Sequence, residues 1–268
     1  MFSNNMDKIT IITVVYNAAV ELNKTIQSVL SQTYQNIEFI VVDGGSDDGT
    51  LDIINNYKDR IAKYVSEPDH GIYDAMNKGI RMSTGKWVNF MNAGDTFFDS
   101  DTCRLVLEKS QPQRDSKVIY GDTMLLFPGL GVVKRDYSKY RGADIPFNIC
   151  HQSSFIDGDT IRSLMYDLSY IISSDANTFY KIFCNGGKFA YIPIPISIYE
   201  SIEGLSSKNL VMMEKEHNRI KGDTKSKWNE FVFRIKIFIK QFLSGLLPRD
   251  IYNRIRFLHI KKLYEQNV

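Results

Sequence analysis

The first hundred residues alternate between two hydrophobic patterns, and this alternation constrains the fold more than any other feature of the sequence. Ile9–Val15 and Ile37–Val42 are apolar, β-branched runs of the kind that form strands buried on both faces. Glu21–Ser31 and Leu51–Tyr57, which follow them, carry apolar residues at helical spacing. Because strands that alternate with helices form βαβ units, the sequence predicts an α/β fold with a Rossmann-like, mostly parallel central sheet.

Acidic residues follow three of the predicted strands. Asp43 ends the second strand, and Asp69 follows a short strand at residues 62–66. After a helix predicted at residues 72–83, a buried strand at residues 87–92 leads to Asp95. Ligands of open α/β sheets bind at the carboxyl ends of the strands, so we expect these groups to converge on one crevice.

The sequence Asn92-Ala93-Gly94-Asp95 ends the fourth strand in small and polar residues. A carboxylate at this position suits a hard divalent cation that in turn holds phosphate oxygens. The alternative is structural, with Asp95 or Asp99 as the N-cap of the next helix. The turn at residues 43–50 is rich in glycine and in hydrogen-bond acceptors that can bind a ribose or a base, but it has neither a dinucleotide fingerprint nor a P-loop.

Charge is distributed unevenly along the chain of 268 residues. The formal net charge is only +2, which gives no reason to expect nucleic acid as a partner. Residues 1–207 hold 19 Lys/Arg and 25 Asp/Glu, whereas residues 208–268 hold 14 and 6. The basic tail therefore predicts contact with an anionic surface.

The cysteines and the N-terminus indicate a cytoplasmic location. The three cysteines are odd in number and lack metal-ligand spacing, as expected in a reducing compartment. The N-terminus has no signal-peptide pattern, and no uncharged apolar run is long enough to span a membrane.

Four segments resemble glycosyltransferase family 2 in their order and spacing: Thr13–Asn17, Val41–Thr50, Ser66–Ile80 and Thr84–Asp95. Members of this family are inverting enzymes with the A-type nucleotide-sugar transferase fold. The run from Glu67 to Gly79 resembles a bacterial subgroup that builds capsule, exopolysaccharide and lipopolysaccharide glycans.

The resemblance implies a donor site and a metal. The implied nucleotide-sugar-binding residues are Thr13, Tyr16, Asp43, Ser46, Asp69, Asn77, Asn92 and Asp95. The family usually has an Asp-x-Asp metal motif here, but Asn92 and Gly94 replace two of its acidic residues, so Asp95 alone keeps a carboxylate. We therefore expect Mg²⁺ or Mn²⁺ to bind weakly without the donor and adequately with it, since Mg²⁺ uses few protein ligands.

Further residues are implied for the acceptor side of the cleft. The family places its catalytic base at the position of Asp175, and His-Gln of the subgroup corresponds to His151 and Gln152. An inverting transfer is one in-line displacement, so the acceptor hydroxyl needs a group that takes its proton. The alternatives are a helix cap for Asp175 and a core or capping histidine for His151.

The second half also contains patterns that concern structure alone. Residues 117–122 and 132–134 predict a hairpin. Pro193 and Pro195 predict that residues 189–193 and 196–199 form edge strands, because proline cannot donate to a central ladder.

The tail is predicted to be helical, with an apolar segment at residues 231–247 and a basic helix after Pro248. It either packs against the catalytic domain or a second subunit, or binds the inner membrane surface through residues 228–268.

These observations predict a catalytic domain at residues 1–207, divided into a nucleotide-sugar half (1–100) and an acceptor half (101–207), with a helical extension at 208–268. The predicted activity is the inverting transfer of one sugar from a nucleotide-diphosphate sugar, with UDP as the default nucleotide, to a glycan or lipid-linked acceptor in bacterial surface polysaccharide synthesis. The alternative is a catalytically impaired nucleotide-sugar-binding scaffold. Both hypotheses, the transferase and the scaffold, are compatible with a homo-oligomer and with a peripheral position on the membrane.

Overall fold

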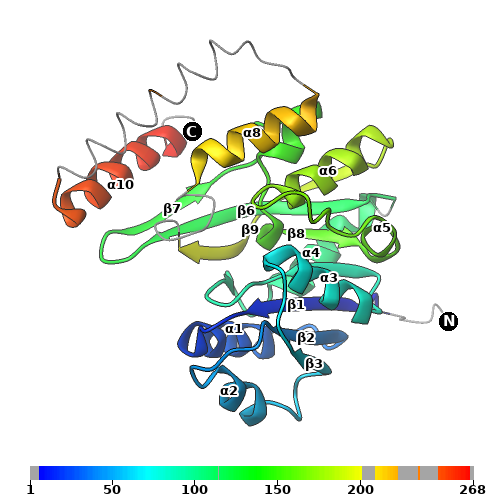
Figure 1. Ribbon diagram of the computed structural model, residues 1–268. Coiled ribbons are helices and arrows are strands. Elements are labelled where there is room, and N and C mark those ends of the chain that lie inside the picture. The colour runs from blue at the N-terminus through cyan, green and yellow to red at the C-terminus, as the bar shows by residue number, and fades with distance from the viewer. Residues whose placement is uncertain (1–5, 114, 201–208, 223–234, 236–246, 266–268) are drawn as a thin grey trace.

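The computed structural model describes residues 6–113, 115–200, 209–222, 235 and 247–265. They form one mixed sheet with the strand order β3-β2-β1-β4-β8-β6-β9-β5, and β7 pairs with β6 (Figure 1). The predicted α/β fold with helices flanking a central sheet is therefore confirmed.

The N-terminal half is the parallel part of the sheet. Strands β2 and β4 both pair in parallel with β1, and β3 pairs in parallel with β2. The elements of this half are β1 (Ile9–Val15), α1 (Ala19–Leu30), β2 (Ile37–Asp43), α2 (Thr50–Asn56), β3 (Lys63–Ser66), α3 (Ile72–Met82) and β4 (Trp87–Phe90). The carboxyl ends of the four strands consequently lie at one edge of the sheet, as expected.

The second half adds antiparallel and parallel pairs. Strand β8 joins the halves, because it pairs antiparallel with both β4 and β6. The helices and strands of this half are β5 (Thr96–Phe97), α4 (Thr102–Ser110), β6 (Val118–Phe127), β7 (Gly131–Arg135), β8 (Ser154–Asp157), α5 (Gly158–Leu164), α6 (Ser174–Cys184), β9 (Phe189–Glu200), α8 (Leu210–Lys221) and α10 (Arg249–Glu265). Short 3₁₀ segments lie at Gln111–Gln113, Gly142–Phe147 and His151–Ser153.

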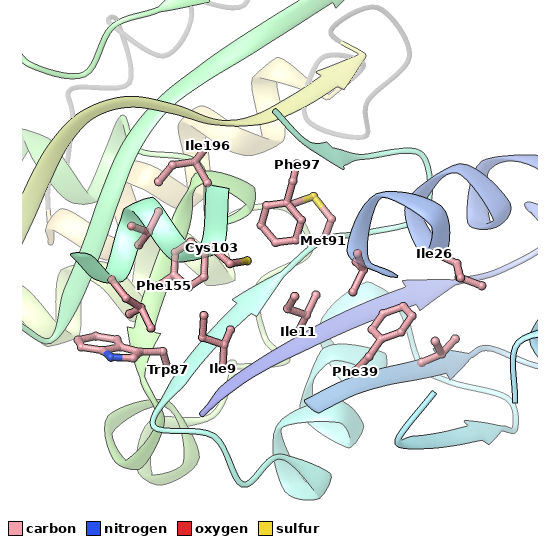
Figure 2. Packing of buried hydrophobic residues seen from close by; sticks show 14 of the residues in the cluster. Ile9, Ile11, Ile26, Phe39, Trp87, Met91, Phe97, Cys103, Phe155 and Ile196 are labelled. Carbon is pink, nitrogen blue, oxygen red and sulfur yellow. The ribbon is translucent and has the colours of Figure 1, made fainter. Parts of the chain in front are cut away.

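Two apolar layers enclose the sheet because side chains alternate along each strand. On β1, Ile9 and Ile11 face the cluster that includes α1, α2 and α4. Figure 2 shows this cluster from close by. Ile12 and Val14 face the opposite cluster, to which α3, α5 and α6 contribute. Burial on both faces explains why β1 is apolar along nearly its whole length.

The predicted hairpin is β6 and β7, but the two predicted edge strands are one continuous strand, β9. Its first half pairs with β6 and with no other described strand, so Pro193 and Pro195 lie on an outer edge as expected. The register shifts opposite Gly121 and Asp122, which accommodates Pro193 and Ile194 without breaking the strand. The second half pairs with both β6 and β5.

The described parts of the tail pack on the second half of the chain. Helix α8 lies beside α6, and α10 lies beside the β6–β7 hairpin (Figure 1). Phe257, Ile260 and Tyr264 of α10 pack on a small cluster formed by Leu125, Phe127 and Val133. Residues 201–208 and most of the apolar segment predicted at 231–247 lie outside the described residues. Among the helices of the described residues, none has the length and apolarity needed to cross a membrane.

Candidate active site

A cleft of about 960 Å³ opens at the carboxyl end of β4, between the two halves of the chain. Five of the residues singled out in the sequence line it: Asn92, Asp95, His151, Gln152 and Asp175. They come from the turn after β4, from the 3₁₀ segment before β8 and from the first turn of α6. The structure thus brings together groups that are up to 83 positions apart in the chain.

Helix α1 fixes the turn that carries Asp95. The Thr25 hydroxyl donates to the backbone carbonyl of Asp95 at 2.7 Å and accepts from the Gly94 amide at 3.0 Å. Gly94 has a φ of +98°, a conformation that a residue with a Cβ rarely adopts. The small residues of this turn therefore place the Asp95 carboxylate at the cleft.

Asp95 is oriented by Gln152, whose Nε2 donates to Oδ2 at 2.9 Å. Burial raises the pKa of Asp95 to about 6, although the hydrogen bond from Gln152 and the charge of His151 oppose this shift. The nearby Asn92 Oδ1 is buried and accepts no hydrogen bond from any described residue.

The Asp95 carboxylate and the Asn92 amide oxygen are groups that could hold a divalent cation. A carboxylate and an amide oxygen are ligands that Mg²⁺ and Mn²⁺ accept. No group of three or more His, Cys, Asp or Glu side chains that could hold a metal ion occurs among the described residues. The protein alone therefore offers few ligands, which agrees with the reduced motif in the sequence.

A chain of hydrogen bonds leads from Asn92 to Asp175. Asn92 Nδ2 lies 3.2 Å from His151 Nε2, and His151 Nδ1 lies 2.9 Å from Asp175 Oδ2. The Asp175 carboxylate can only accept, so we assign a proton to His151 Nδ1 from this network. The other carboxylate oxygen, Oδ1, accepts from the Tyr73 hydroxyl at 3.0 Å and from the Ala176 amide at 2.9 Å.

Asp175 is held as a carboxylate. Burial favours its neutral form, but the hydrogen bond and the charge of His151, with the Ala176 amide and the Tyr73 hydroxyl, outweigh burial and lower the pKa of Asp175. Its side chain remains 20% exposed, so a substrate in the cleft can reach it. Asp175 is therefore ionised at neutral pH and able to accept a proton.

The segment before Asp175 is fixed by Glu216 of α8, a residue that sequence reasoning missed. The buried Glu216 carboxylate accepts hydrogen bonds from the backbone amides of Ile171, Ile172 and Ser173 at 2.6, 3.0 and 2.8 Å. The Tyr73 hydroxyl lies 2.5 Å from the carbonyl oxygen of Ile172 and shares its one hydrogen between that oxygen and Asp175 Oδ1. Helices α3 and α8 thus hold both sides of the chain that leads into α6.

Four other residues of the predicted donor site form a separate group at the ends of β1, β2 and β3. Tyr16 is 65% exposed, and its ring and the Asp69 carboxylate both lie beside Gly44. A Cβ at Gly44 would lie only 2.5 Å from Asp69 Oδ2, so a larger residue there would displace the Asp69 side chain. Asp43 is buried and accepts from the Ser46 amide at 3.1 Å and from the Ser66 hydroxyl at 2.6 Å.

Thr13 and Asn77 are buried and bonded to the backbone. The Thr13 hydroxyl donates to the Met91 carbonyl at 2.7 Å. Asn77 exchanges two hydrogen bonds of 2.8 Å with the backbone of Tyr166. In this structure, neither side chain lines the cleft, and both support the walls of the site.

Two comparisons of the sequence with known proteins both find glycosyltransferases. The family model described as Glycosyl transferase family 2 matches residues 10–129. The PGL/p-HBAD biosynthesis glycosyltransferase of Mycobacterium bovis is 30% identical over 199 residues, which are 71% of this chain and 76% of that protein.

Solved structures share the fold at low sequence identity. The S. aureus TarS structure in complex with UDP-GlcNAc has a TM-score of 0.65 and 14% identity, over 83% of this chain and 69% of that one. This chain covers 41% of another, longer TarS chain. The mannosyltransferase PcManGT from Pyrobaculum calidifontis, in complex with GDP-Man and Mn²⁺, has a TM-score of 0.60 and 17% identity, over 80% of this chain and 64% of that one.

Proposed function

Because this chain belongs to glycosyltransferase family 2, we propose that it transfers one sugar, with inversion, from a nucleotide-diphosphate sugar to a glycan or lipid-linked acceptor in bacterial surface polysaccharide synthesis. UDP-sugars are the first donors to test, since the TarS relative of the same fold binds UDP-GlcNAc. The observation that carries the proposal is that Asp175, held by His151, faces the same cleft as Asp95.

The proposed reaction is a single displacement. The acceptor hydroxyl oxygen attacks the anomeric carbon while the bond from that carbon to the diphosphate oxygen breaks. The hydroxyl proton passes to Asp175, and the bonding electrons leave with the nucleoside diphosphate. His151 and Tyr73 keep the Asp175 carboxylate directed into the cleft and stabilise its charge before the transfer.

Asp95 is the proposed protein ligand of Mg²⁺ or Mn²⁺, with Asn92 beside it. When bound, such an ion would neutralise the charge that develops on the leaving diphosphate. Support comes from the orientation of Asp95 by Gln152 and from the Mn²⁺ in the PcManGT structure of the same fold. Tyr16, Asp43, Ser46 and Asp69 are the proposed contacts or supports of the nucleoside.

The test combines binding with turnover in the full chain. We expect wild-type protein with Mn²⁺ to be stabilised thermally by one of UDP, GDP or dTDP, and to release that nucleotide from its sugar when a membrane extract supplies the acceptor. Asp175→Asn should keep the thermal shift and lose at least about 100-fold in turnover, the range of a general base. Asp159→Asn is the matched control, because this carboxylate is 94% exposed and does not line the cleft.

Asp175→Asn turnover close to that of the wild type would refute this mechanism. Nucleotide binding by the wild type without turnover on any donor or extract would instead favour the nucleotide-sugar-binding scaffold.

We also propose a peripheral position on the cytoplasmic face of the membrane, where a lipid-linked acceptor is available. Support comes from α10, whose apolar residues are divided between two sides. Phe257 and Ile260 pack on the β6–β7 hairpin, while Ile251, Ile255 and Leu258 are 48–57% exposed. Basic residues of the same helix suit an anionic leaflet.

A further inference from the structure

Arg135 is a cation in the cleft that has no carboxylate partner among the described residues. It ends β7 and forms part of the cleft lining beside Cys150 and Tyr199. Its Nε is buried and makes no hydrogen bond, and Arg135 has no ion pair within 4.0 Å among the described residues. The adjacent Lys134, in contrast, pairs with the buried Asp122 at 2.8 Å. The positive charge of Arg135 is therefore not used to hold the fold through a carboxylate.

Two aromatic rings position the guanidinium. Its central carbon lies 5.2 Å from the ring centroid of Tyr137 and 6.0 Å from that of Tyr264 in α10. Rings stabilise a cation through their faces and do not accept its N–H groups as a carboxylate does. The donors of Arg135 therefore remain available for a ligand that enters the cleft.

The chemistry of this position favours a phosphate. A partly desolvated guanidinium without an acceptor is unfavourable unless something hydrates or binds it. Its planar set of donors matches two phosphate oxygens better than a neutral sugar hydroxyl. The other charged residues that line the cleft are Lys24, Lys221 and Arg256 on the basic side and Glu21, Asp95, Asp175 and Glu200 on the acidic side.

The reduced metal motif leaves part of a diphosphate's charge to be neutralised by other groups. Asp95 is the sole carboxylate of that motif. Asp95 and Arg135 both line the cleft that Cys150 and Tyr199 also line. A phosphate bound in this cleft would therefore share one site with both groups.

We propose that Arg135 binds a phosphate group of a substrate in the cleft. This inference rests on the proposed transferase function. The phosphate has two possible sources: the nucleoside diphosphate of the donor, or the phosphate of a lipid-linked acceptor.

The experiment measures binding by calorimetry to the full chain with Mn²⁺, for wild type, Arg135→Gln and Arg135→Lys. The donor probes are UDP and uridine, with GDP and guanosine if the protein prefers guanine. The acceptor probe is farnesyl diphosphate, added to protein already saturated with the nucleoside diphosphate. Lys139→Gln is the charge-matched control, because Lys139 lies 4.8 Å from the same Tyr264 ring but does not line the cleft.

If the donor is the source of the phosphate, Arg135→Gln lowers the affinity for UDP at least about tenfold, which is the contribution of one charge-assisted hydrogen bond. The affinity for uridine stays unchanged. If the acceptor is the source, the affinity for UDP is unchanged and the affinity for farnesyl diphosphate falls by the same factor. In either case Arg135→Lys restores part of the affinity, and it provides the comparison if the glutamine variant does not fold. Lys139→Gln behaves as wild type.

Equal affinities of wild type and both Arg135 variants for UDP and for farnesyl diphosphate would overturn the inference while leaving the transferase proposal intact. A wild type that binds no nucleotide would overturn the proposed function and this inference together.

Discussion

Removal of the Glu216 carboxylate should destabilise the protein and disable its proposed base. Glu216→Ala leaves three backbone amides without their acceptor. Ile171 is 59% exposed, so water can reach its amide, but Ile172 and Ser173 are only 9% and 2% exposed. A buried donor left unpaired costs about 1–3 kcal/mol, so two of them predict a loss of roughly 3 kcal/mol in the free energy of unfolding. For a chain of this size that corresponds to a fall in Tm of about 6–12 °C.

Thermal unfolding of the full chain measures this effect, with Arg219→Gln as the control. Arg219 lies one turn further along α8 and donates to the carbonyl and the hydroxyl of Ser169, at 3.2 and 2.8 Å. The Arg219 guanidinium also lies 4.4 Å from the ring centroid of the buried Tyr170. Loss of these contacts should change the free energy of unfolding by about 1–2 kcal/mol, less than the loss of Glu216. Both variants weaken the contact of α8 with the same loop, but Glu216→Ala alone frees the amides next to Asp175.

Activity separates positioning from stability. At a temperature well below both transitions, Glu216→Ala should lower kcat by more than it raises KM, because Asp175 loses its fixed position. The Arg219→Gln variant should keep kcat near the wild-type value. If the Tm and kcat of Glu216→Ala matched those of Arg219→Gln, the carboxylate would not hold the segment, and the reasoning would fail.

Three other predictions concern His151, Glu38 and helix α10. His151→Gln removes the largest of the interactions that lower the pKa of Asp175, so that pKa should rise and the acidic limb of the kcat/KM profile should move to higher pH. An unchanged limb would remove His151 from the mechanism. Burial raises the pKa of Glu38, but hydrogen bonds from Lys63, Thr10 and Thr84 lower it to about 2, below the ordinary glutamate value of 4.5. Its contribution to stability is therefore complete above pH 4.5 and is lost as the pH falls toward 2. Urea unfolding between pH 5 and 3 should show a smaller pH dependence for Glu38→Gln than for wild type, and equal slopes would contradict this. Replacing the exposed apolar residues of α10 with serine (Ile251→Ser, Ile255→Ser, Leu258→Ser) should reduce co-sedimentation with anionic liposomes and leave Tm unchanged; equal sedimentation would argue against the membrane contact.

The sequence was most informative where structure depends on local patterns. Strand β1 was predicted at its observed boundaries, and the neighbouring elements were predicted within a residue or two, because burial on both faces gives a continuous apolar run. The convergence of Asp95, His151 and Asp175 followed from the family resemblance, and the structure places all three at one cleft. Contacts within the site, such as Tyr73 to Asp175 across 102 positions, had no local pattern that could reveal them.

Glu216 is an instructive omission. It lies three residues after Met213 and four before Ile220, which places a carboxylate on the apolar side of a helix. A charged residue at such a position is buried with a partner or is strongly unfavourable, so the pattern could have indicated a tertiary contact. The identity of the contact, three amides of a loop about 45 positions earlier, depends on the packing of α8 on α6 and lies beyond any sequence window.

The raised pKa of Asp95 bears on how the binding of the metal and of the donor is coupled. Burial raises its pKa to about 6, and a cation must displace the remaining proton and accept a site with few other protein ligands. A diphosphate that arrived with the cation would supply the missing oxygens, and Arg135 would compensate part of its charge. The metal and the donor should therefore bind with positive coupling, each raising the affinity of the other by the same factor. Titration of Mn²⁺ with and without UDP measures this factor, and a value of one would contradict a shared site for the metal and the diphosphate.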